Sequence, residues 1–95
     1  MESGYIYMLC NEKKNVLYVG VSSNLRKRIY CHKRGLISGF SQRYNTHRLV
    51  YFEELSSMKA ARAREKQLKG FRREKKDSLV TEMNPTWCDL YEELR

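Results

Sequence analysis

The chain has 95 residues, of which 41% are hydrophobic and 12% aromatic, enough for one folded domain with a modest core. Its 19 Lys and Arg residues against 11 Asp and Glu give a net charge of +8, which favours a partner that carries phosphates. No apolar run approaches the roughly 18 residues of a membrane span, and three cysteines without a CxxC pair disfavour a disulfide framework and a zinc site.

The first part of the chain predicts a β-hairpin. Residues 4–10 and 16–20 are apolar and rich in tyrosine and β-branched side chains, which favour strands. The polar sequence NEKK between them suits a loop. With four residues in that loop, Tyr7 pairs with Tyr18, and both tyrosines then lie on one face of the hairpin.

A strongly basic helix is expected next, over residues 22–35. Ser or Asn caps its start, and Gly35 closes it. Its apolar stripe consists of Leu25, Ile29 and Leu36. Arg28 and His32 flank that stripe one turn apart, so their side chains point in similar directions.

The remaining elements predict an α+β domain. They are a polar loop (36–46), a third strand (47–54), a helix capped by Ser57 and ended by Gly70, a helix (71–84) that Pro85 stops, and a short C-terminal helix (about 86–94). Thr86 and Asp89 resemble a capping box for that last helix. We expect a single domain over residues 1–95, with its core at about 4–83. Its small three-stranded sheet, mixed or antiparallel, combines the hairpin with the later strand, and helices flank it.

One position of the second helix breaks its apolar pattern. Met58, Ala61, Glu65 and Leu68 have the spacing of a buried stripe, so Glu65 stands where an apolar residue is expected. A carboxylate there needs a partner, a metal or a wet cleft. Pairing with one of the many arginines and binding of a divalent cation both remain open.

Several residues that lie far apart in the chain form an ordered set. The set consists of YIY (5–7), YVG (18–20), Arg28, His32, Glu65 and Asn84. It resembles the signature of the GIY-YIG nucleases, with Tyr5 in place of the first glycine. The resemblance covers nearly the whole chain and is closest to small single-domain endonuclease-like proteins of bacteria.

The resemblance implies a GIY-YIG-like fold and a phosphodiester hydrolase that uses one Mg²⁺ or Mn²⁺ ion. Tyr7 would contact or deprotonate the attacking water, and Tyr18 would orient the water or the phosphate. Arg28 would hold the scissile phosphate through its planar fork of donors. Glu65 would bind the metal, and His32 would relay or accept the proton, which leaves open whether Tyr7 or His32 is the general base.

Each of these residues also has a structural interpretation. Strand tyrosines usually pack, a single helical histidine usually lies on the surface, and Arg28 could be one more phosphate anchor among its basic neighbours. Gly20 is a supporting position of the second tripeptide. Asn84 precedes a proline, where a turn or capping role is favoured over a catalytic one.

The basic residues predict a nucleic-acid surface, with a merely solvated surface as the alternative. The expected contacts are Arg26, Lys27, Arg43, Lys66, Lys69, Arg72 and Arg73. DNA is favoured, with single-stranded or structured DNA in repair or recombination as the candidate substrate, since Phe40, Arg43 and Tyr44 could stack unpaired bases. A catalytically inactive nucleic-acid-binding module and an RNA-directed nuclease remain the alternatives. The sequence indicates no membrane association and no obligate protein partner, and the absence of a signal peptide and of paired cysteines favours the cytoplasm.

Overall fold

A three-stranded antiparallel sheet forms the centre of the computed structural model, which describes residues 3–36, 39 and 43–94. The strands are β1 (Gly4–Cys10), β2 (Leu17–Ser22) and β3 (Arg48–Leu55). Their order in the sheet is β2-β1-β3, so β1 is central and the other two strands are edges. The predicted hairpin and later strand are confirmed, and the sheet is antiparallel throughout.

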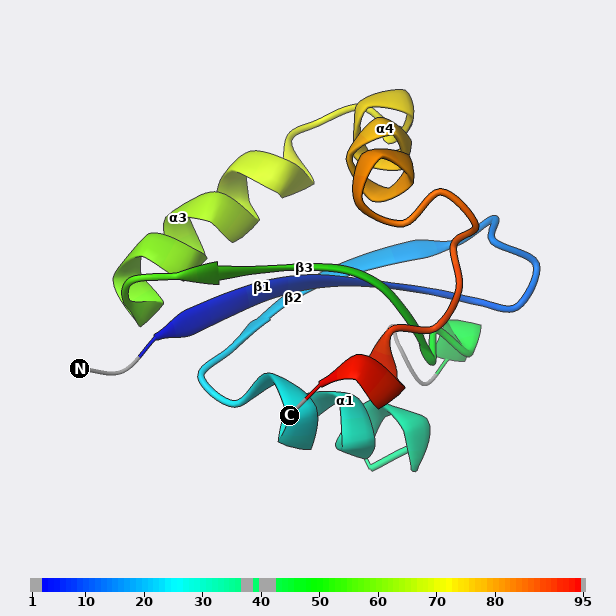
Figure 1. Ribbon diagram of the computed structural model, residues 1–95, viewed down its shortest axis with the longest axis horizontal. Coiled ribbons are helices and arrows are strands. Elements are labelled where there is room, and N and C mark those ends of the chain that lie inside the picture. Colours follow the sequence, from blue (N-terminus) through cyan, green and yellow to red (C-terminus); the bar gives the residue numbers. More distant parts are fainter. Residues whose placement is uncertain (1–2, 37–38, 40–42, 95) are drawn as a thin grey trace.

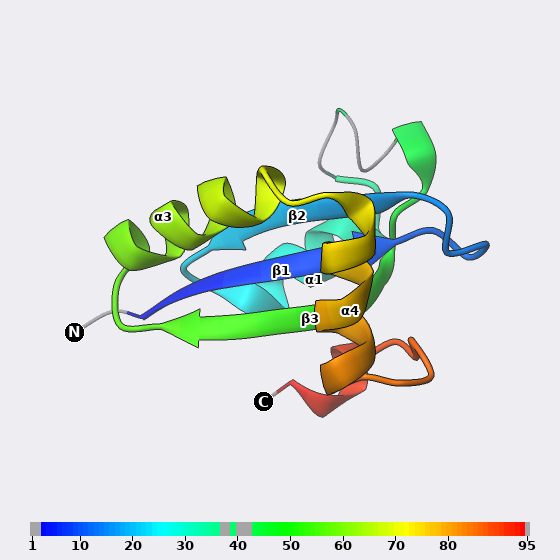
Figure 2. The same cartoon turned by 90° about the horizontal axis from the view of Figure 1, so that it is seen from above.

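Helices cover both faces of the sheet (Figure 1). On one face lie α1 (Leu25–Lys33) and a C-terminal 3₁₀ turn, η1 (Tyr91–Glu93). On the other face lie α3 (Met58–Lys69) and α4 (Arg73–Met83). Seen from above, α3 runs beside β2 and α4 lies over β3 (Figure 2). None of the helices in the described part of the chain is both long and apolar enough to cross a bilayer.

The alternating side chains of β1 divide the core into two layers. Ile6, Met8 and Cys10 are buried beneath α3 and α4, where they meet Ala61, Leu68 and Val80. Tyr7 and Leu9 are buried on the opposite face, where they meet Leu25, Ile29 and Leu90. Tyr7 and Tyr18 therefore share the α1 face, as the hairpin pattern predicts.

The register of the hairpin differs from the expected one. Tyr7 pairs with Gly20, and Tyr18 pairs with Leu9. The expected four-residue loop is too short because the Asn11 side chain accepts hydrogen bonds from the backbone N–H groups of Asn15 and Val16, which holds a longer turn. The shift amounts to two residues along the strand, so every side chain keeps its predicted face.

The apolar stripe of α1 also differs at its end. Asn24 caps the helix through its side chain, and the helix ends at Lys33, before Gly35 at φ 68° reverses the chain. Leu36 therefore lies beyond the helix and is 67% exposed. His32 takes the third buried position instead, at 2% exposure.

The predicted C-terminal helix is wrong. Residues 84–90 are irregular, and only the 3₁₀ turn follows. Asp89 does not form a capping box with Thr86, because its carboxylate accepts hydrogen bonds from the backbone N–H groups of Leu49 and Tyr91. The Asp89 carboxylate therefore binds the backbone of β3 instead of capping a local helix.

Candidate active site

The ring of Tyr7 lies across the edge strand β2. Gly20 is its directly paired residue, and a Cβ atom at Gly20 would lie 2.4 Å from the Tyr7 ring and hydroxyl. That separation is far shorter than any van der Waals contact, so only glycine leaves room for the ring there. The missing side chain lets the Tyr7 hydroxyl extend from the central strand over β2, toward the edge of the sheet.

The hydroxyl of Tyr7 meets His32 on α1. The oxygen lies 2.9 Å from His32 Nε2, and both residues are almost fully buried. Burial is the main cause that raises the pKa of Tyr7 well above its usual range. Burial, followed by the charge of Arg28, lowers the pKa of His32 from 6.5 to about 4. Both groups are therefore neutral at neutral pH.

Tyr18 completes a cluster of three rings. Its ring centroid lies 6.3 Å from that of Tyr7 and 5.5 Å from that of His32. Arg28 is exposed beside this cluster, and its charge acts on the pKa values of both Tyr7 and His32. Four of the predicted site residues thus meet at one place on the α1 face.

Glu65 approaches the same place from the opposite layer. Its helix, α3, packs on β1 and β2 through Ala61 and Leu68, so Glu65 lies on the side of α3 that faces the sheet. Its side chain is 21% exposed, and the charge of Glu65 contributes to the raised pKa of Tyr7, after burial and the effects of Tyr18 and Arg28. Lys69, one turn later, lies 3.2 Å from the Glu65 carboxylate and forms an ion pair with it.

The donor set around Glu65 suits a hexacoordinate cation that retains water. The described residues contain no group of three or more His, Cys, Asp or Glu side chains that could enclose a metal. Mg²⁺ is commonly held by one or two carboxylates, with waters and substrate phosphates as its other ligands. A single, partly exposed carboxylate beside the tyrosines therefore fits such an ion, whereas zinc requires more protein ligands.

Most of the sequence matches a known protein family. The sequence pattern of the GIY-YIG catalytic domain matches residues 3–77, which is most of the chain. The chain belongs to the GIY-YIG family. That family assignment indicates a nuclease-type catalytic domain with a nucleic acid as its substrate, and a divalent metal is typical of the family.

The similar proteins are themselves small. UPF0213 protein CPE1444 of Clostridium perfringens is 33% identical over 78 residues, which cover 81% of this chain and 82% of that protein. UPF0213 protein SSP2268 of Staphylococcus saprophyticus is 34% identical over 83 residues, 86% of this chain and 99% of the relative. An archaeal relative, UPF0213 protein HQ_3675A of Haloquadratum walsbyi, is 30% identical over 79 residues, 82% of this chain and 86% of the relative. No solved structure gives a significant match.

The basic residues of this GIY-YIG domain fall into two groups. Lys27, Lys66 and Arg72 are exposed. In contrast, Arg26 donates to the backbone oxygen of Leu94, and Arg73 donates to the backbone oxygens of Lys14 and Asn15 and pairs with Asp77. Arg26 and Arg73 thus have intramolecular roles that the charge pattern alone did not indicate.

The last two predicted contacts are Lys69 and Arg43. Lys69 pairs with Glu65, and the Arg43 guanidinium lies 5.8 Å from the centroid of the exposed Tyr44 ring. Phe40, which was predicted to stack bases together with Arg43 and Tyr44, lies outside the described residues.

Asn84 holds the chain after α4. Its side-chain amide donates to the backbone oxygens of Val50 and Cys88, and its side-chain oxygen accepts from the Cys88 backbone N–H. At 4% exposure it is part of the fold. These contacts agree with the capping role that the following proline favours.

Two charged residues near the site were not predicted to lie there. Asp89 forms an ion pair with Lys33 of α1 in addition to its bonds to backbone N–H groups. Arg48 begins β3, and its Nε is buried without a hydrogen-bond partner among the described residues. The surroundings of both residues come from segments more than ten residues apart, which no local spacing reveals.

Proposed function

We propose that this GIY-YIG domain is a divalent-metal-dependent endonuclease that hydrolyses phosphodiester bonds in DNA. The buried hydrogen bond between the Tyr7 hydroxyl and His32 Nε2 carries the proposal. It would let the Tyr7 oxygen accept a proton from water while His32 accepts the proton of Tyr7. Arg28 and Glu65 both act electrostatically on that hydroxyl, so a phosphate anchor and a metal-binding carboxylate lie within reach of it.

Tyr7 and His32 supply the proton path. In the tautomer that the reaction requires, His32 Nε2 is unprotonated and accepts the hydrogen bond of the Tyr7 hydroxyl. As the attacking water loses a proton to the Tyr7 oxygen, the proton of Tyr7 passes to His32 Nε2. The resulting hydroxide forms the new bond to phosphorus, and the bond from phosphorus to the 3′ oxygen breaks. Tyr18 borders both rings and orients the water.

Arg28 and Glu65 serve the phosphate. The Arg28 guanidinium holds two phosphate oxygens through its fork of N–H donors. Glu65 would hold the divalent cation. When bound, that ion supplies positive charge to the phosphate and to the leaving 3′ oxygen.

Two exposed tyrosines favour substrates with unpaired bases. Tyr30 and Tyr44 are 45% and 43% exposed. Each ring lies under an arginine guanidinium, Arg34 at 5.6 Å from the Tyr30 centroid and Arg43 at 5.8 Å from the Tyr44 centroid. Such rings can stack on any base without reading its sequence. We therefore propose single-stranded or structured DNA as the preferred substrate.

The test combines cleavage with metal-free binding. Glu65→Gln keeps the side-chain volume and removes the charge that binds the metal, so cleavage with Mg²⁺ should fall at least about 100-fold. Binding of labelled DNA in EDTA should be equal to or tighter than that of the wild-type protein, because a negative charge has left the phosphate site. Glu82→Gln removes the same charge from an exposed position on α4 and serves as the control.

The outcomes separate the candidate functions. Equal cleavage by Glu65→Gln and wild type contradicts the metal assignment or reveals a contaminating nuclease, which a mock purification identifies. Wild-type binding without cleavage on single- and double-stranded DNA and RNA indicates an inactive binding module. Faster cleavage of RNA than of DNA indicates an RNA-directed nuclease.

A further inference from the structure

A cavity lies where β1 ends and β3 begins. Its volume is about 430 Å³, and its lining includes Glu12, Lys33, His47, Arg48 and Asp89. Residues from the hairpin loop, α1, β3 and the C-terminal segment thus meet in one hollow. None of these five residues has a role in the proton path proposed above.

Arg48 is the unexplained group in this cavity. Its side-chain Nε is the one buried side-chain nitrogen or oxygen without a hydrogen-bond partner among the residues that the structure describes. A guanidinium keeps its positive charge at every physiological pH. A buried donor atom without an acceptor lowers stability. Arg48 as a whole is only partly buried and lines the cavity, so an anionic ligand that enters the cavity could supply an acceptor to its guanidinium.

Neither Asp89 nor Glu12, the two carboxylates that line the cavity in the described part of the chain, forms an ion pair with Arg48. Asp89 is already compensated, because it pairs with Lys33 and accepts from two backbone N–H groups. Glu12 is exposed on the hairpin loop, where water solvates its charge. Arg48 is thus the cation of the cavity whose charge no buried carboxylate balances.

Short contacts connect the cavity to the active site. His47 Nδ1 donates a hydrogen bond of 2.8 Å to the backbone oxygen of His32, the residue that holds the Tyr7 hydroxyl. Lys33 follows His32 in α1 and donates to the backbone oxygen of His47. A nucleic-acid strand bound at Arg28 and Tyr7 would place neighbouring phosphates close to this cavity, since phosphates repeat along every strand.

We propose that Arg48 binds a backbone phosphate of the nucleic acid other than the scissile one. The proposal rests on the proposed function for the identity of the substrate, and it adds a second phosphate contact beyond Arg28. Its guanidinium fork donates to the phosphate oxygens, and Lys33 remains paired with Asp89. Such a contact sets the register of the strand and carries no base specificity.

Metal-free binding tests this contact without any cleavage. A short labelled single-stranded DNA is titrated in EDTA over a series of salt concentrations with wild type, Arg48→Gln and Arg62→Gln. Arg62 is exposed on α3 and controls for the loss of one charge. Arg48→Gln should bind about 10-fold more weakly, as expected for one charged hydrogen bond, and its salt slope should fall by about 0.7. Arg62→Gln should change affinity by less than about two-fold.

A second measurement reports on Arg48 directly in the wild-type protein. The Arg48 Nε–H resonance is followed by NMR during separate titrations with the oligonucleotide and with inorganic phosphate. A shift with the oligonucleotide supports the proposal. A shift with inorganic phosphate alone overturns it in favour of a free-phosphate pocket, and no shift in either titration also overturns it.

The remaining outcomes are equally decisive. Equal affinities and slopes for Arg48→Gln and Arg62→Gln overturn the proposal. Should Arg48→Gln fail to fold in a thermal melt, Arg48→Lys keeps the charge without the fork and should still bind more weakly than wild type. A wild-type protein that binds DNA through Arg48 but never cleaves it contradicts the proposed catalysis and leaves this contact intact.

Discussion

Burial is the main reason that both Tyr7 and His32 are neutral, since it raises the pKa of Tyr7 and lowers the pKa of His32. In the proposed proton path, transfer of the Tyr7 proton to the neutral imidazole would place a positive charge on His32 within this buried site. A bound phosphate would stabilise that charge.

The first prediction concerns the Tyr7 hydroxyl. Tyr7→Phe keeps the ring over Gly20 and removes the proton path, so the single-turnover rate should fall by about 100- to 10,000-fold, the usual contribution of general acid–base catalysis. Binding of DNA in EDTA should change little. Tyr51→Phe is the matched control, because Tyr51 is buried on the other face of the same sheet, where its hydroxyl donates to Glu53. Equal rates for the two variants would remove Tyr7 from the mechanism.

The buried imidazole also predicts how stability depends on pH. The pKa of His32 is lowered from 6.5 to about 4 in the folded protein, so the unfolded chain takes up a proton first as the pH falls. The stabilisation is present above pH 6.5 and is lost progressively down to about pH 4, by about 3 kcal/mol in total.

Urea unfolding between pH 7 and pH 4.5 measures this dependence. His32→Gln should reduce the slope in that range, whereas His47→Gln, which alters the other histidine, should keep most of it. A wild-type free energy of unfolding that stays constant over this range would contradict the burial of a neutral His32.

At the scale of elements, the edge strand β2 provides access to the site. Gly20 leaves space for the Tyr7 ring across β2, and α3 lies beside that strand on the other face (Figure 2). Because no further strand lies beyond β2 in the part of the chain that the structure describes, a side chain of α3 can approach the tyrosines around the edge of the sheet. A central strand at this position would separate Glu65 from Tyr7.

A methyl group at Gly20 therefore tests the geometry of the strand. Gly20→Ala should displace the Tyr7 ring, lower the free energy of unfolding by about 1–3 kcal/mol and reduce cleavage. Gly70→Ala is the control, because a Cβ atom there meets its nearest neighbour at 3.4 Å, an ordinary contact. Thermal melts and single-turnover rates of both variants measure the effects on stability and cleavage. Wild-type behaviour of Gly20→Ala would show that Tyr7 does not need its observed position.

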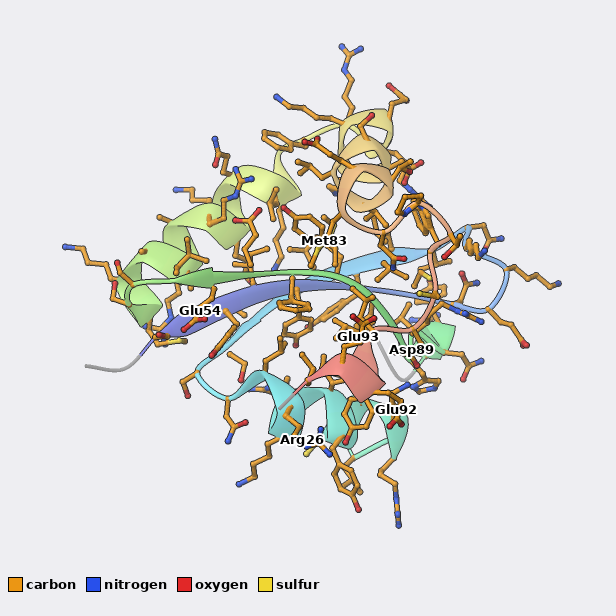
Figure 3. The ribbon with its side chains drawn as sticks, in the orientation of Figure 1. Arg26, Glu54, Met83, Asp89, Glu92 and Glu93 are labelled. Atoms are coloured by element: carbon orange, nitrogen blue, oxygen red, sulfur yellow. The ribbon has the colours of Figure 1, made fainter. Side chains whose placement is uncertain are left out.

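The C-terminal segment (residues 89–94) contacts both α1 and β3. Asp89 contacts Lys33 and the backbone of Leu49, and the backbone N–H of Leu90 donates to the backbone oxygen of Leu49. Arg26 lies on α1 below the turn that carries Glu92 and Glu93 (Figure 3), and it donates to the backbone oxygen of Leu94. This segment lies beyond residues 3–77, which match the family pattern, yet it holds the helix that carries Arg28 and His32.

At the scale of the whole molecule, acidic side chains limit where a polyanion can approach. Glu54 and Glu93 line a cavity with Arg26 at the N-terminal end of α1. The exposed basic residues Lys27, Lys66 and Arg72 lie elsewhere, on α1 and at α3 and its end. We therefore expect the nucleic acid to avoid the turn at the C-terminus and to run along the side of α1 that bears Arg28.

Substitutions of two neighbouring arginines distinguish a surface charge that binds DNA from a side chain that stabilises the fold. Arg72→Gln removes an exposed charge, so it should weaken DNA binding, lower the salt slope by about 0.7 to 0.9 and leave the melting temperature unchanged. Arg73→Gln removes the bonds between α4 and the hairpin loop, so it should lower the melting temperature with a smaller change in slope. Thermal melts and binding in EDTA measure both effects. The opposite pattern would show that Arg73 faces the nucleic acid.

The amino-acid sequence by itself determined the hairpin, the later strand, the helices up to residue 83 and the ordered tyrosine, arginine, histidine and glutamate positions. These follow from local causes. Side-chain alternation assigns Tyr7 and Tyr18 to one face whatever the register, because a shift of two residues preserves the face. The caps Asn24 and Ser57 bind backbone groups three residues away, so their roles are visible in a short window.

Tertiary structure alone decided the burial of His32 in place of Leu36 and the loss of the C-terminal helix. It also decided the partners of Asp89, the internal roles of Arg26 and Arg73, and the approach of Glu65 to Tyr7. Each of these depends on segments that lie far apart in the chain. Asp89 shows the reason most clearly, because a carboxylate that suits a helix start instead binds the backbone of a strand 40 residues earlier, a contact that forms only once the sheet has formed.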